Sequence, residues 1–267
     1  ERADRIGGLL RYGIPEFKME KAVLDRRLAL MEAEGVVFRP GMHIGKDVSL
    51  SRLRQDFGAV LLAGGAGAPR DLRVPGRELG GIHFAMEYLT LSNQRCAGDA
   101  IPESRFISAA GRHVVIIGGG DTGADCLGTA TRQGAASVHQ LELLPQPPDT
   151  RAADNPWPQW PNVYRVSPAH EEGGERLYAV STERFVGDAG GRVAVLQAVK
   201  VAVTRTDGRM EVTPVPGSAF DIKADLVLLA MGFVGPERGP LFDELGVALT
   251  DRGTVRRDER WMTNVPG

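Results

Sequence analysis

The sequence predicts an α/β fold, in which apolar strands end at glycines and alternate with helices. The run Val114-Val115-Ile116-Ile117 leads directly into three consecutive glycines, and the run 225–230 leads into Met231-Gly232. Glycine is also abundant, with 34 residues in 267, which is nearly twice the average of ~7%. Such placement is typical of sheets that turn the chain toward a ligand at the strand ends.

The composition excludes several classes of protein. The 32 basic and 34 acidic residues give a charge of −2 and a pI near 6.3, which leaves no basic footprint for nucleic acid or anionic membranes. No apolar run approaches the roughly 20 residues that span a bilayer, and the charged start 1–5 holds no signal-peptide core and no Met. We expect a cytoplasmic globular protein with neither a nucleic acid nor a membrane as partner.

The cysteines and histidines are too scattered for a metal site. Cys96 and Cys126 are the two cysteines, and the five histidines occur singly, so no disulfide framework, metal centre or iron–sulfur cluster is expected. Cys126 follows a glycine turn on a predicted helix, where an inert buried thiol is expected rather than a redox centre. Cys96 lies in a polar loop.

The first third of the chain contains one amphipathic pattern and two apolar runs. The spacing of Val23, Leu24 and Met31 predicts a helix that ends at Gly35. Proline and arginine then mark an extended connection between domains. The elements expected here are a helix over 18–34, a short strand at 36–38, a buried strand at 59–63 and the connection over 67–81.

The middle of the chain predicts a βαβ unit. A helix from residue 83 to 91 comes first. A buried strand over 113–117, a glycine turn, a helix ending at Arg132 and a strand over 137–144 follow.

The passage that follows this unit is rich in proline. Residues 145–161 hold six of the 17 prolines together with Trp157 and Trp160, so regular structure is excluded. An ordered surface loop and a functional lid both fit, with the tryptophans expected to pack the loop rather than to stack on a nicotinamide. Beyond it we expect antiparallel strands at 178–185, 192–204 and 210–215, turns at 188–191 and Asp207-Gly208, and a buried strand at 225–230.

The sharpest motif is the turn Gly-Gly-Gly-Asp-Thr-Gly after the strand 113–117. Gly118 allows a tight exit from the strand, Gly120 leaves room for a pyrophosphate, and Gly123 lets helix and strand pack closely. Amides at the start of the helix would face the phosphates. The turn, Gly118, Gly119, Gly120, Asp121, Thr122 and Gly123, is therefore predicted to bind a dinucleotide; the alternative is a tight turn without a ligand.

Acidic residues near this turn have two possible roles. Asp121 and Asp125 lie near the helix start, where an acid can simply cap the helix. Glu142 lies about 20 residues past the glycines, where an acid binds an adenosine ribose and favours NADH over NADPH. Arg151 is close enough in sequence to bind a 2′-phosphate instead, so both cofactors stay open.

Four further motifs carry a family resemblance. Together with the glycine turn and the runs ending at Ala63-Gly64-Gly65 and Met231-Gly232, they resemble the small (beta) subunits of glutamate synthase, a family of two-dinucleotide flavoprotein reductases. The motifs are Gly-Gly-Leu-Leu-Arg-Tyr-Gly-Ile-Pro at 7–15, Val-Pro-Gly-Arg-Glu at 74–78, Gly-Ile-His-Phe-Ala-Met at 81–86 and Asn-Pro-Trp-Pro at 155–158.

The resemblance implies a fold and a reaction. A Rossmann-like NAD(P)H-binding domain, 69–235, with three layers and an antiparallel β excursion, would be inserted in an FAD-binding domain represented by 1–68 and 236–267. Hydride would pass from NADPH to FAD, and electrons would leave through iron–sulfur clusters to the large subunit, which makes glutamate from glutamine and 2-oxoglutarate. No catalytic acid or base is expected, because the flavin performs the hydride chemistry.

The resemblance also implies FAD contacts. Glu1 would bind the adenosine ribose, Val48 would lie near the adenine, and residues of two strand ends would line the site. The residues implied at the flavin and at the strand ends are Gly8, Leu9, Arg11, Tyr12, Gly13, Ile14, Pro15, Ala63, Gly64, Gly65, Met231 and Gly232.

Some family features are missing from the 267 residues. The FAD fingerprint would precede Glu1, the second FAD segment would follow Thr263 to Gly267, and the cluster cysteines would lie upstream. We therefore expect an excised middle piece that is inactive in isolation. The strand ending Glu142-Leu143-Leu144 also lacks the basic residues of related reductases, which weakens the case for NADPH.

Two rival functions fit the same motifs. A non-catalytic nucleotide-sensing or assembly module would keep the glycine turn without reducing a flavin. A related flavin reductase would pass electrons to a different acceptor, such as a pyrimidine or a ferredoxin.

Overall fold

The computed structural model describes residues 1–206 and 209–266, which divide into two compact units. The first comprises residues 1–12, 16–70 and 232–267, and the second comprises 13–15 and 71–231. The sequence placed the domain limits at 68/69 and 235/236, near these breaks. Which unit serves which cofactor stays a prediction.

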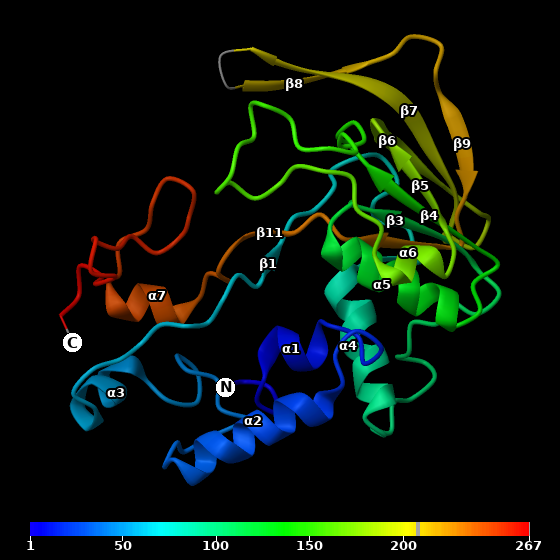
Figure 1. The fold of residues 1–267 in the computed structure, drawn as a ribbon. Coiled ribbons are helices and arrows are strands. Elements are labelled where there is room, and N and C mark those ends of the chain that lie inside the picture. Colours follow the sequence, from blue (N-terminus) through cyan, green and yellow to red (C-terminus); the bar gives the residue numbers. More distant parts are fainter. Residues whose placement is uncertain (207–208, 267) are drawn as a thin grey trace. The chain divides into compact units, whose positions relative to one another are not determined.

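The second unit is built on a parallel sheet of five strands (Figure 1). Val115 lies opposite Val227 on one side and His139 on the other, so β3 is a central strand. In spatial order the strands are β2 (Ile82–Phe84), β10 (Leu226–Leu229), β3 (His113–Ile117), β4 (Ser137–Glu142) and β5 (Glu175–Tyr178).

Helices cover one face of this sheet. On this face Val114 and Leu228, both fully buried, pack with Tyr88 and Leu127 of the helices. Successive side chains of a strand point to opposite faces, so the alternate residues are left for the other side. The helices of the second unit are α4 (Ala85–Cys96), α5 (Asp121–Arg132) and the short α6 (Pro168–Glu171).

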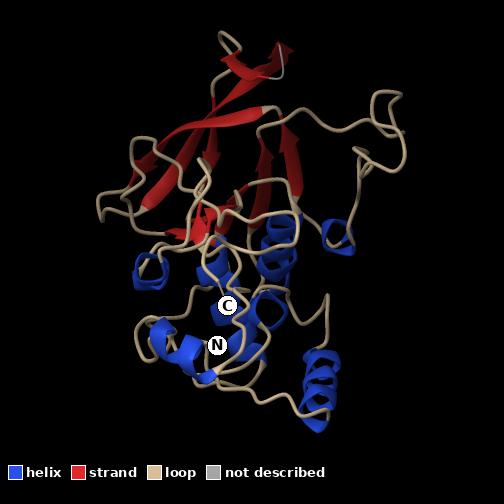
Figure 2. Cartoon of the chain, turned by 90° about the vertical axis from the view of Figure 1, so that its left-hand side faces the viewer, coloured by secondary structure: helices blue, strands red, loops and turns tan. Residues whose placement is uncertain are grey.

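An antiparallel sheet covers the opposite face. Figure 2 draws the strands of both sheets in red and the helices in blue. Val115 and Leu229 of the parallel sheet pack there with Phe185, Leu196 and Ile222. The strands are β6 (Val180–Gly187), β7 (Val193–Thr206), β8 (Arg209–Pro214) and β9 (Phe220–Lys223). This three-layer arrangement confirms the predicted fold class.

The first unit has little apolar core. Among its described residues the buried hydrophobic side chains are Tyr12, Leu24, Leu50 and Val247, and polar contacts connect its segments. Arg2 donates to both oxygens of Glu237, at 2.5 and 2.7 Å. Its elements are α1 (Gly8–Tyr12), α2 (Lys21–Ala33), α3 (Leu50–Asp56), α7 (Pro240–Leu245) and the antiparallel pair β1 (Ala68–Pro69) and β11 (Phe233–Gly235).

Two strands expected in the first unit do not form. Residues 36–38 and 59–63 lie outside every helix and strand, and Leu61 is 88% exposed. A strand needs neighbours for its backbone N–H and C=O groups, and neither segment pairs with a described strand. The apolar pattern of 59–63 was therefore insufficient, and the prediction of a buried strand was wrong.

Other boundaries shifted for local reasons. The predicted helix at 83–91 begins at Ala85 because His83 belongs to β2, and the helix at 18–34 begins at Lys21 with Leu24 as its buried residue. The expected strand 178–185 is two strands, because Ala179, with φ of 56°, turns the chain from β5 into β6. The strand at 113–117, the helix end at Arg132 and the turn at 188–191 are confirmed. The turn expected at 207–208 lies outside the described residues.

Two leucines in similar apolar runs should respond differently to truncation. Leu228→Ala removes a fully buried side chain and should lower the free energy of unfolding of the 267-residue chain by about 2–5 kcal/mol. Leu61→Ala alters an exposed side chain and should change it by less than about 0.5 kcal/mol. Urea denaturation followed by circular dichroism measures both; equal losses would contradict the burial of only one run.

Candidate functional site

The glycine turn begins at the carboxyl end of β3, the central strand. The chain after β10 crosses beside it, and the amide of Ala230 donates to the carbonyl of Ile117 at 2.8 Å. Gly118 has φ of +130°, and a Cβ placed there would overlap the carbonyl oxygen of Ala230. Only glycine fits this position, because strand pairing brings backbone against backbone.

The turn opens onto the start of α5. Gly120 is the N-cap residue, no side chain caps the helix, and a Cβ built on Gly120 would meet nothing within 4 Å. The first amides of a helix have no partner within the helix, and the helix dipole favours an anion there. The geometry therefore suits a phosphate group that approaches the backbone closely.

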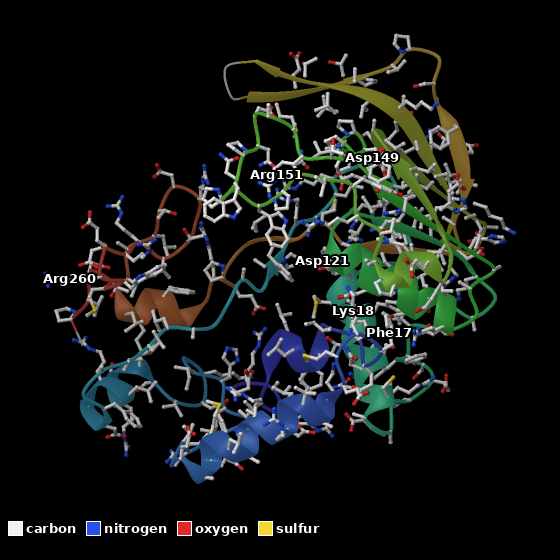
Figure 3. The ribbon with its side chains drawn as sticks, in the orientation of Figure 1. Phe17, Lys18, Asp121, Asp149, Arg151 and Arg260 are labelled. Carbon is white, nitrogen blue, oxygen red and sulfur yellow. The ribbon has the colours of Figure 1, made fainter. Side chains whose placement is uncertain are left out.

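Neither of the two acids considered as caps is the N-cap residue of the helix. Asp121 lies in the first turn of α5 (Figure 3) and is exposed, and Gly120 takes the N-cap position. Asp125 lies one turn further along and is buried. Asp121 thus has the place in the first turn that the helix dipole favours, while the N-cap position belongs to Gly120.

Gly123 lets α5 approach the sheet. A Cβ on this buried residue would overlap the carbonyl oxygen of Gly118 and Nε2 of Gln140. Gly123, the last glycine of the motif, therefore has the packing role that its spacing predicts.

Glu142 lies at the end of β4 and turns toward the glycines. Its Oε2 accepts a hydrogen bond from the amide of Gly119 at 2.9 Å, and its Oε1 accepts one from the amide of Leu144 at 2.8 Å. The structure thus brings together two sequence-predicted features, the turn and the acid after the next strand.

Arg151 belongs to the long loop that follows β4 (Figure 3). Its Nη1 donates to the carbonyl oxygens of Asn155 and Gln159 at 3.1 and 3.0 Å. The guanidinium therefore connects residues of the same loop by hydrogen bonds. The expected pairing of Arg151 with a nucleotide phosphate stays a prediction.

The tryptophans of this loop do not pack it as expected. Trp157 and Trp160 are 82% and 78% exposed. Trp160 contacts the guanidinium of Arg165, whose Cζ lies 4.4 Å from the ring centroid. The residues 145–161 form neither helix nor strand, which confirms the expectation from their prolines.

The residues implied at the flavin are placed in several segments. In the first unit, Arg11 binds Asp25 through Nη2 and the carbonyl of Ile6 through Nε at 2.6 Å, and the hydroxyl of Tyr12 donates to Asp4. The carboxylate of Glu1 accepts from the amide of Ala3.

The remaining implied flavin residues lie mostly in turns and loops. Their role in binding FAD stays a prediction. Gly8 and Leu9 start α1, and Val48 forms a β-bridge with Ile44. Ala63, Gly64 and Gly65 lie outside the helices and strands, Met231 and Gly232 follow β10, and Gly13, Ile14 and Pro15 belong to the second unit.

Two polar residues of the site escaped sequence reasoning. Gln140 is 1% exposed in the middle of β4, and its Nε2 donates to the carbonyl of Gly118 at 2.9 Å. His170 contacts the other end of the same amide, with its Nε2 2.9 Å from Oε1. A buried polar residue two positions before Glu142 was the available signal, since such a group needs partners.

The two cysteines differ in environment. Cys126 is buried in α5, and burial raises the pKa of its thiol, whereas Cys96 is exposed. Among the described residues, no group of three or more His, Cys, Asp and Glu side chains could hold a metal ion.

Comparisons with known proteins identify the family of the chain. The family model for pyridine nucleotide-disulphide oxidoreductases matches residues 29–267. All of the chain aligns with the small chain of glutamate synthase [NADPH] from Mycobacterium tuberculosis at 59% identity, covering 54% of that relative. Over 89% of its length the chain is 47% identical to glutamate synthase [NADH] of Schizosaccharomyces pombe, of which it covers 12%. The chain therefore spans about half the length of the small chain it matches, and the predicted family resemblance is confirmed.

Solved structures share the fold. FprA from Mycobacterium tuberculosis, in complex with NADPH, superposes with a TM-score of 0.69 at 16% identity, covering 97% of this chain and 67% of FprA. Thioredoxin reductase from T. acidophilum gives a TM-score of 0.56 at 17% identity, covering 100% of this chain and 78% of the reductase.

Two glycines of the turn should tolerate alanine differently. Gly118→Ala forces a Cβ onto a carbonyl oxygen at positive φ and should cost at least about 2 kcal/mol of stability. Gly120→Ala places its methyl in open space and should cost at most about 1 kcal/mol, the loss of a preferred N-cap residue. Thermal unfolding measures both; an equally damaging Gly120→Ala would refute the openness of this position.

The thiols should label selectively. At pH 8 a maleimide should modify Cys96 in the native chain and leave Cys126 unmodified, because a raised pKa and burial keep that thiol protonated and inaccessible. Mass spectrometry of tryptic peptides identifies the site, and Cys96→Ser should abolish native labelling. Labelling of Cys126 without denaturant would contradict an inert, buried thiol.

Proposed function

The chain belongs to the pyridine nucleotide-disulphide oxidoreductase family, and we propose that it is the electron-input part of a glutamate synthase small subunit. In this role NADPH delivers hydride to FAD. The observation that carries the proposal is the uncapped start of α5, with open space at Gly120. The 59% identity to a glutamate synthase small chain supports the choice of reductase.

The glycine turn would hold the pyrophosphate of the nicotinamide nucleotide. The amides of Gly120, Asp121 and Thr122 offer donors at the positive end of α5, and the missing side chain of Gly120 allows close approach. These residues fit an anion with backbone donors alone. They would orient the nucleotide and take no part in proton transfer.

FAD would be held by the residues named for it above. A bound flavin supplies the hydride acceptor and passes electrons onward. The glycines among them fit a close approach of a ligand, because Cβ atoms on Gly8, Gly64, Gly65 and Gly232 would meet nothing within 4 Å. No acid or base from this chain is required, so none is assigned.

NADPH is the first choice of nucleotide and NADH the second. Small chains from Mycobacterium tuberculosis and Bacillus subtilis are named for NADPH, and the yeast relatives for NADH. The carboxylate at the end of β4 favours NADH, because Glu142 would repel a 2′-phosphate. Its two hydrogen bonds to backbone amides offset part of that charge locally.

The assignment extends to the whole protein as a set of proposals. Electrons would continue through iron–sulfur clusters outside these residues to the large subunit, which makes glutamate from glutamine and 2-oxoglutarate. The complex would work in the cytoplasm. None of the helices in the described part of the chain is long and apolar enough to cross a bilayer.

Visible spectroscopy of the full-length protein tests this function. We expect the protein to contain bound flavin whose absorbance is bleached anaerobically when NADPH is added. NADH should bleach the same flavin more slowly. Gly120→Ala should lower kcat/KM for NADPH at least about tenfold, since a methyl then occupies the pyrophosphate approach. A colourless protein that still binds NADPH would favour the sensing module, and reoxidation by a pyrimidine or ferredoxin without glutamate formation would favour another reductase.

A further inference from the structure

The peptide between Gly118 and Gly119 is bound at both ends by side chains of one strand. Nε2 of Gln140 donates to its carbonyl oxygen at 2.9 Å, and its N–H donates to Oε2 of Glu142 at 2.9 Å. Gln140 and Glu142 are two residues apart on β4, so their side chains share a face of the sheet. Two neighbouring side chains thus fix a single peptide group.

We propose that Gln140 and Glu142 are positioning residues that hold the glycine turn ready for the phosphates of the nucleotide. The inference rests on the proposed function and adds how affinity at the turn is set. It also gives Glu142 a task at the turn in addition to ribose recognition.

We call the two hydrogen bonds from Gln140 to Gly118 and from Gly119 to Glu142 the clamp. A turn of consecutive glycines needs such a constraint. Glycine adopts many backbone conformations, so a peptide between two glycines can rotate at little steric cost. Rotation would exchange the directions of its C=O and N–H groups, which would place the oxygen against the carboxylate of Glu142 and displace the amides that follow, those offered to the phosphates. Each bond of the clamp is lost on rotation, and Gln140, at 1% exposure, would leave a buried amide unpaired.

His170 fixes the direction of the Gln140 amide. The amide of Ser167 lies 3.2 Å from Nδ1 of His170 and can only donate, so Nδ1 accepts. The proton of a neutral imidazole is then on Nε2, which donates to Oε1 of Gln140 at 2.9 Å. This leaves Nε2 of Gln140 to donate to Gly118, and the bonds from Ser167 to the turn all run in one direction.

Packing leaves space for this amide at one position. A Cβ on Gly123 would overlap Nε2 of Gln140. The absence of a side chain at Gly123 therefore leaves room both for the close approach of α5 and for the Gln140 amide. An apolar side chain of similar size at 140 would fill the same volume and donate nothing. The role of Gln140 is therefore separable from packing.

Gln140→Glu in the full-length protein tests the proposal, because it preserves shape and exchanges the donor for a titratable group. The dissociation constant of NADPH is measured by fluorescence titration between about pH 5 and pH 8, the range into which burial shifts a carboxyl group. At pH 8 the ionised carboxylate faces an oxygen, and the dissociation constant should be roughly tenfold above wild type. At pH 5 the protonated carboxyl can donate to Gly118, and the difference should shrink to about twofold.

The control is Val138→Ala. Val138 is buried on the same face of β4, lies opposite Val114 of β3 and packs in the core on the helix side. Val138→Ala should lower the unfolding temperature. The ratio of its NADPH dissociation constant to that of wild type should be the same at every pH. The ionisable groups nearest to the substitution are His170, which contacts residue 140, and Glu142, which binds the same peptide. Expressing each result relative to wild type at the same pH removes the pH effects that the variants have in common.

The outcomes separate the two levels of the proposal. A Gln140→Glu protein whose affinity ratio stays flat with pH, as in Val138→Ala, would overturn the clamp and leave the function standing. A wild-type protein that binds neither NADPH nor NADH would overturn the proposed function and the clamp with it. Should Gln140→Glu not fold, His170→Leu decides: it should raise the dissociation constant roughly threefold, and an unchanged value would overturn the clamp.

Discussion

The second unit depends on a parallel sheet that is covered on both faces. β3 lies between β10 and β4, and its side chains alternate between two apolar layers, with Val114 and Ile116 toward the helices and Val115 toward the antiparallel sheet. Apolar side chains cover both faces of β3. A slip of its register by one residue would therefore turn each side chain from one layer to the other. The strand ends, and the turn that leaves them, are placed by this constraint.

The glycine turn inherits its shape from these neighbours. Ala230 on one side excludes a side chain at Gly118, and Gln140 and Glu142 on the other side bind the next peptide. Backbone amides at the start of α5 are then left for a ligand. The first unit differs, because it buries few apolar side chains and exposed ion pairs such as Arg2 with Glu237 connect its segments.

Local chemistry made part of the site readable from sequence. The 20 residues 113–132 encode the strand, the glycine spacing after it and the helix that follows. The structure agrees with all three. Glu142 was identified from its distance along the chain, although its hydrogen bond to Gly119 was not. Gln140 and His170 are 30 residues apart, and nothing in the sequence pairs them, because a hydrogen bond across elements has no local pattern.

Two apolar runs separate what the sequence determined from what the tertiary structure decided. Both 59–63 and 226–229 are apolar segments that lead toward glycine, and by pattern alone each is a buried strand. Residues 226–229 lie between β2 and β3 and form β10, whereas 59–63 have no described partner strand, and Leu61 is exposed. The sequence determined the apolar character and the glycine turn, which are properties of neighbouring residues. Only the tertiary structure decided which run became a strand, because backbone hydrogen bonds in a sheet come from other parts of the chain.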